Sequence, residues 1–170
     1  MQGELLALRV IHVLGGTFWA GALLFMSFFL LPSLAEAGPA AGAVSAGLEK
    51  RHLLNWLPVV ALLTILSGLR LLMRASGGFG GAFFETTQGQ VYVVAAIASI
   101  VALVLGLTVS RPAMNAAGRL VAQLPDAAPD ARAGLMAQAA ALRVKSAKAV
   151  RVIALLVLLS ALVMSVARYL

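Results

Sequence analysis

The chain has 170 residues, of which 62% are hydrophobic and 11% are charged, and its mean hydropathy is +1.00. Soluble domains carry about 45 to 50% apolar and about 25% charged residues, so these values exclude an ordinary soluble fold. The net charge of +7 comes from Lys and Arg residues that flank apolar runs, which favours anionic lipid headgroups over nucleic acid as their partner; the absence of cysteine excludes disulfides, iron-sulfur clusters and thiolate metal sites.

Four apolar segments are long enough to cross a bilayer, which takes roughly 20 helical residues. We therefore expect an all-α, polytopic membrane protein, folded as one antiparallel four-helix bundle that uses the whole chain, 1–170, as a single domain. The four segments span residues 5–31, 53–73, 91–109 and 150–167.

Proline and glycine mark the expected ends of these segments. The first is predicted to end at Pro32 and the Gly38-Pro39 pair, and the third at Arg111-Pro112, because proline lacks the backbone donor that continues a helix. The second is predicted to close at Arg74, before a glycine-rich turn.

The stretch 111–146, between the third and fourth segments, is polar but rich in alanine. Two prolines between 125 and 129 divide it into two predicted helices, and Asp130 is the expected N-cap of the second. Apolar residues recur there at helical spacing, so this helix is predicted to be an amphipathic extension of the fourth membrane helix. These apolar residues are Leu135, Met136, Ala139 and Leu142.

Basic residues divide unequally between the two sides of the predicted bundle. The side with the termini has four, and the side with the first and third loops has nine. Because basic loops stay in the cytoplasm, both termini are predicted to lie outside and the two basic loops in the cytoplasm. The four are Arg9, Arg70, Arg74 and Arg168; the nine are Lys50, Arg51, Arg111, Arg119, Arg132, Arg143, Lys145, Lys148 and Arg151.

His12 is the strongest candidate for a functional residue, because an ionisable group within the hydrocarbon is costly. Gly16 and Trp19 follow it on the same face of the first helix. The glycine leaves space either for a flat ligand or for a close neighbouring helix. The alternative to a ligand role is a neutral histidine that donates to a serine or to a backbone carbonyl of the next helix.

Antiparallel packing is expected to bring several other polar residues to the depth of His12. Arg9 and Arg70 would flank that layer and neutralise carboxylates such as haem propionates, and Met164 would offer a thioether ligand. Alternatively, the arginines snorkel to headgroups and the small residues pack helices. The other residues of the layer are Thr64, Ser67, Gly68, Gln90, Tyr92 and Ser160.

His52 is expected to be different in kind. It follows Glu49-Lys50-Arg51 at the opposite end of the bundle, so we interpret it as an interfacial residue that shares no metal or haem with His12.

The first helix resembles the four-helix membrane proteins of the bacterial copper-resistance D family and the wider group of HemJ-type protoporphyrinogen oxidases. The resemblance rests on the run from Arg9 to Gly21, with His12, Gly16 and Trp19, and on the exit at Leu31-Pro32. A weaker similarity is the proline exit of the third helix, at Arg111-Pro112. The resemblance implies an inner-membrane bundle in which His12 serves a haem b or copper site.

Two hypotheses follow for the function. In the first, His12 binds haem b or copper for electron transfer or copper handling. In the second, the chain is a structural subunit of a larger respiratory or photosynthetic complex, or a homo-oligomer, without a cofactor. The first requires space beside His12 in the bundle interior, whereas the second allows the histidine to be packed.

Overall fold

The computed structural model describes residues 2–169, which form helices and turns. Within this range four helices are long and apolar enough to cross a membrane. The predicted all-α architecture with four membrane helices is therefore confirmed. The four continuous helices span Gln2–Glu36, Leu53–Ala75, Thr87–Ala122 and Pro129–Val166.

The elements follow one another with short connections. The first long helix comprises α1 (Gln2–Phe25), η1 (Met26–Leu30) and α2 (Leu31–Glu36), and the second is α4 (Leu53–Ala75). The third comprises α6 (Thr87–Leu105), η3 (Gly106–Ser110) and α7 (Arg111–Ala122), and the fourth is α8 (Pro129–Val166). The short elements are η2 (Gly38–Ala40), α3 (Ala41–Lys50), α5 (Gly81–Glu85) and η4 (Ala167–Tyr169).

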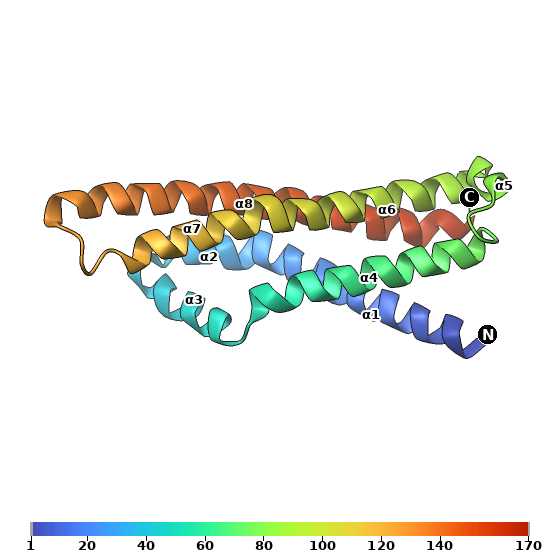
Figure 1. Ribbon diagram of the computed structural model, residues 1–170, viewed down its shortest axis with the longest axis horizontal. Helices are drawn as coiled ribbons and strands as arrows, with labels where there is room; N and C mark the ends of the chain where they lie inside the picture. Colours follow the sequence, from blue (N-terminus) through green and yellow to red (C-terminus); the bar gives the residue numbers. More distant parts are fainter. Residues whose placement is uncertain (1, 170) are drawn as a thin grey trace.

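The bundle consists of two antiparallel helix pairs. α1 packs along α4, and α6 with α7 packs along α8; α1 also contacts α8, and α4 contacts α6 (Figure 1). Helix α1 begins and α8 ends at the same end of the molecule as α5, which we call the terminus end. We call the opposite end, with α3 and the α7–α8 connection, the loop end.

The first helix continues through Pro32 but ends at Glu36, just before the Gly38-Pro39 pair that was also predicted to end it, and the third helix continues through Pro112. In each, a π-helical segment, η1 or η3, precedes the proline, and the helix runs on to Glu36 or Ala122. The amides of Leu31 and Arg111, which directly follow these segments, donate to the carbonyls five residues back, Met26 O and Gly106 O. A proline ring clashes with the carbonyl four residues earlier in an α-helix, and the wider π turn relieves that clash.

The predicted amphipathic extension is confirmed, because α8 continues unbroken from Pro129 into the membrane segment, with α7 packed antiparallel to it (Figure 1). Ala139 is buried, as expected, but Met136 is 61% exposed. The predicted N-cap at Asp130 is wrong, since the helix begins at Pro129 after Ala128, with no side-chain cap. Proline, with its fixed φ, favours the first helical turn and sets this start.

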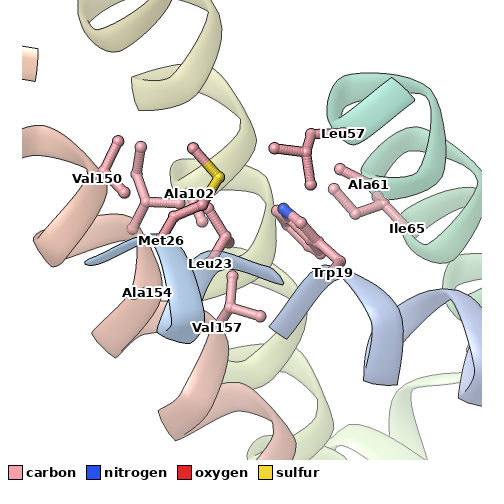
Figure 2. Packing of buried hydrophobic residues seen from close by; sticks show 11 residues of the cluster. Trp19, Leu23, Met26, Leu57, Ala61, Ile65, Ala102, Val150, Ala154 and Val157 are labelled. Carbon is pink, nitrogen blue, oxygen red and sulfur yellow. The ribbon is translucent and has the colours of Figure 1, made fainter. Parts of the chain in front are cut away.

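The apolar core lies in the loop-side half of the membrane region. Trp19 of α1 points towards Leu57 and Ala61 of α4, in the cluster drawn in Figure 2. Small residues let the backbones approach: Ala61, Ala102 and Ala154, from three different helices, are each at most 1% exposed. The remaining members of the cluster are Leu23, Met26, Leu57, Ile65, Val150, Ile153 and Val157.

Candidate functional site

His12 lies on α1, on the side of the apolar core that faces the terminus end, and its side chain is half-buried against α4. Its Nδ1 is 2.8 Å from the backbone carbonyl oxygen of Thr64. Because a carbonyl oxygen only accepts hydrogen bonds, Nδ1 is the donor, and a neutral ring then carries its lone pair on Nε2. No hydrogen bond to Nε2 occurs among the residues that the structure describes.

Glycines on both helices make this contact possible. A Cβ atom at Gly68 of α4 would lie 2.6 Å from Cε1 of His12 and 2.9 Å from its Nδ1. On α1, a Cβ at Gly15 would lie 2.5 Å from Oγ1 of Thr64, and one at Gly16 would lie 3.5 Å from its Cγ2. The space predicted beside Gly16 is therefore taken by Thr64 of a close neighbouring helix, one of the two uses expected for it.

The hydroxyl groups of the same layer bond within α4. Oγ1 of Thr64 donates to Val60 O at 2.8 Å, and Oγ of Ser67 donates to Leu63 O at 2.7 Å. Ser67 also donates to Thr64 O at 3.0 Å, so that one carbonyl accepts from both Ser67 and His12. The hydroxyl groups of Thr64 and Ser67 are thereby satisfied without water or ligand.

His12, Gly16 and Trp19 share one face, as predicted, and that face packs towards α4. Trp19 is 4% exposed and belongs to the apolar core. It therefore takes part in core packing, about two helical turns along α1 from His12.

Arg70 does not stand free beside this layer, because Glu4 of α1 binds it. Oε1 of Glu4 lies 2.8 Å from Nη2 and 3.1 Å from Nε of Arg70, and Oε2 of Glu4 pairs with Arg74. Sequence reasoning missed Glu4, although an acid at the start of one helix and two arginines one turn apart at the end of the next are a recognisable antiparallel pattern. Arg9 is exposed and is not part of this ion-pair cluster.

The remaining predicted members of the layer do not gather at His12. Tyr92 stacks on Phe83 and accepts a 3.4 Å hydrogen bond from Gln88. Ser160 lies 2.9 Å from Ser99 and donates to Ala95 O at 2.9 Å, so it joins α8 to α6. Met164 is half-buried on α8, one turn beyond Ser160, and Gln90 is exposed.

His52 lies at the loop end, as predicted. It is exposed and precedes the first residue of α4, with left-handed backbone angles of φ 55° and ψ 27°. Its carbonyl accepts from the amides of Asn55 and Trp56, so the residue forms the corner between α3 and α4.

Metal ligands do not cluster within residues 2–169, where no group of three or more His, Asp or Glu side chains is placed to hold an ion.

The geometry and hydropathy define the chain as a multi-pass membrane protein built as a four-helix bundle. Comparison with protein-family models, with curated proteins and with solved structures finds no match.

Proposed function

We propose that the protein is a structural subunit of a larger energy-transducing membrane assembly, to which it contributes helices and lipid contacts. The observation that carries this proposal is how the chain uses its intramembrane polar groups. His12, Thr64 and Ser67 bond to carbonyls of α4, and Ser99 and Ser160 join α6 to α8. These bonds serve helix packing, which is the geometry expected of a structural subunit.

The third helix offers the surface on which such an assembly would form. Within the most apolar stretch of each span, 22% of residues are buried in the first and second helices, 28% in the fourth and 11% in the third. On α6, Val94, Ile97 and Val101 are each more than 40% exposed. The third helix therefore has the most surface left for a neighbouring subunit to cover.

Photo-crosslinking tests this proposal in native membranes. A photoreactive residue at Ile97 on α6 is expected to give one discrete adduct with a different polypeptide. The same residue at Val10, on the exposed face of α1, is the matched control and is expected to give lipid adducts. Lipid adducts at both positions, or an adduct between two copies of this chain, would contradict the subunit role.

His12 supports a second candidate function, as a ligand of haem b or copper. A histidine that binds a metal through one nitrogen usually donates its other N–H to a carbonyl or carboxylate, which is the arrangement of Nδ1 and Thr64 O. The imidazole fits this role, whereas the space beside Gly16 is filled and Arg70 is paired with Glu4. When bound, haem b would supply one-electron chemistry, and His12 would orient Nε2 towards its iron.

Absorbance in the Soret region, with metal analysis, tests the ligand role. Protein made with ample haem and copper is expected to carry a signal that His12→Ala removes and His52→Ala retains. Colourless, metal-free protein would exclude this candidate and leave the subunit proposal standing.

We also propose that the terminus end faces the periplasm of a bacterial inner membrane, from the division of four and nine basic residues. The chain lacks cysteine, so single cysteines report topology cleanly. Gly81→Cys on the terminus end is expected to react with an impermeant thiol reagent outside intact cells, and Asp126→Cys on the loop end is not. The reverse labelling would invert the orientation.

A further inference from the structure

Four basic residues lie near one level of the bundle, where η3 is followed by α7 and packs against α8. The hydroxyl groups of Ser110 and Ser146 lie 2.9 Å apart, which places these two residues at one level of the bundle. Arg111 follows Ser110, and Lys145 and Lys148 lie within two residues of Ser146. Arg151 follows Ser146 by five residues, which places it about 7.5 Å closer to the membrane centre at the helical rise per residue. We call Arg111, Lys145, Lys148 and Arg151, all of them exposed, the basic belt.

No acidic side chain compensates these charges in the part of the chain that the structure describes. The two ion pairs found there both involve Glu4, at the opposite end of the molecule. Arg111 has one hydrogen bond, from Nη2 to Oδ1 of Asn55 at 2.9 Å, and an amide oxygen leaves its charge in place. The belt therefore carries four positive charges that the protein itself does not neutralise.

The belt continues the lipid-facing surfaces of both helices. On α8, Lys148 is followed at helical spacing by Val152 and Leu155, which are 49% and 50% exposed. On the other helix, Arg111 lies one turn beyond Leu107, which is 42% exposed. The exposed face of each helix thus changes from apolar to basic at one level, where acyl chains meet headgroups.

We propose that the basic belt is a binding site for the phosphate groups of anionic phospholipids, with phosphatidylglycerol as the simplest ligand. A zwitterionic headgroup carries its own positive group, so its net attraction to the basic belt is small. An anionic headgroup has no such group and neutralises the positive charge of the belt. Guanidinium groups also bind phosphate oxygens in bidentate fashion, which favours Arg111 and Arg151 as the direct contacts. This inference is independent of the subunit and cofactor proposals.

Lipid-binding measurements on the full chain test the proposal. The protein is reconstituted in phosphatidylcholine vesicles with and without phosphatidylglycerol, and spin-labelled lipids report the motionally restricted shell. The wild type is expected to prefer labelled phosphatidylglycerol over phosphatidylcholine roughly five-fold or more, the effect of about one cation near an anionic surface. The double variant Arg111→Gln/Arg151→Gln, which removes both guanidinium contacts, is expected to reduce this preference towards equality.

Arg119→Gln/Arg132→Gln is the matched control, because it removes the same charge from the same hairpin further from the membrane. This control is expected to keep the preference. Equal association of the two lipids with the wild type, or equal loss in both double variants, would overturn the proposal. Displacement of the lipid by millimolar inorganic phosphate would also overturn it, since the belt would then be a site for free phosphate.

Discussion

The two helix pairs of the bundle are joined by different chemistry. In the α1–α4 pair, an imidazole donates to a backbone carbonyl and a carboxylate binds two guanidinium groups. In the α6–α8 pair, serine hydroxyls at two levels make the interhelical hydrogen bonds. A serine reaches across a close contact with little volume, whereas the histidine requires a glycine opposite its ring. The first pair therefore depends on matched large and small residues, and the second has small serines at its hydrogen-bonded levels.

Gly68→Ala is expected to have the largest effect on this comparison. The added Cβ would lie 2.6 Å from Cε1 of His12, so the ring must leave its place and the hydrogen bond to Thr64 O must break. Overpacking of this kind costs about 1 to 3 kcal/mol of unfolding free energy, measurable by denaturation in mixed micelles. Gly21→Ala on α1 is the control, since its Cβ would meet nothing within 4 Å. Equal effects at the two glycines would show that the His12 contact is not tight.

His12→Ala and Ser160→Ala compare the two pairs directly. Interhelical hydrogen bonds in membranes contribute about 0.6 kcal/mol on average and up to about 1.7 kcal/mol. His12→Ala also removes the ring that fills the space over Gly68, so its loss of unfolding free energy is expected near the upper figure. Ser160→Ala is expected near the average, because little volume is lost. A larger loss of unfolding free energy for Ser160→Ala than for His12→Ala would mean that the stronger interhelical contact lies in the α6–α8 pair.

Glu4→Gln tests the ion pairs at the terminus end of the first helix pair. Its partners Arg70 and Arg74 have side chains that are 39% and 38% exposed, so solvent and salt screen the attraction. The loss of unfolding free energy is expected to be smaller than for His12→Ala and to disappear at high salt. Glu85→Gln, an exposed acid at the same end, is the control. A salt-independent loss for Glu4→Gln would mean that the carboxylate acts through packing.

Sequence patterns predicted the helices well, because the length of an apolar run is set by the thickness of the bilayer. They also placed Thr64 and Gly68 opposite His12, since antiparallel helices of equal rise bring matching depths together. They did not predict the passage of helices through Pro32 and Pro112, because rules for proline assume α-helical hydrogen bonding and each proline follows a π-helical segment.

The use of Gly16 was open for a different reason. A glycine one turn from a histidine gives the same sequence pattern whether the space next to the glycine holds a ligand or a side chain of another helix. Thr64, which fills the space next to Gly16, lies 48 residues further along the chain. The pairing of Glu4 with Arg70 likewise joins residues that are 66 positions apart and that meet through the antiparallel packing of α1 with α4. Contacts between segments that are distant in the sequence therefore determine both what fills the space next to Gly16 and which residue pairs with Arg70.

His52→Ala is expected to change the unfolding free energy least, and it tests whether the side chain of His52 contributes to the stability of the α1–α4 pair. His52 is exposed at the loop end and serves the corner before α4 through its backbone, while its side chain caps nothing. Substitutions at such positions change the unfolding free energy by no more than about 0.5 kcal/mol. His52→Gly is expected to stabilise slightly instead, because φ is 55° and glycine adopts this left-handed conformation without the steric cost of a Cβ. Denaturation of both His52 variants and of His12→Ala under the same conditions measures how their changes in unfolding free energy rank. A loss at His52→Ala as large as that at His12→Ala would mean that the imidazole at the corner makes a contact as important as the one inside the bundle.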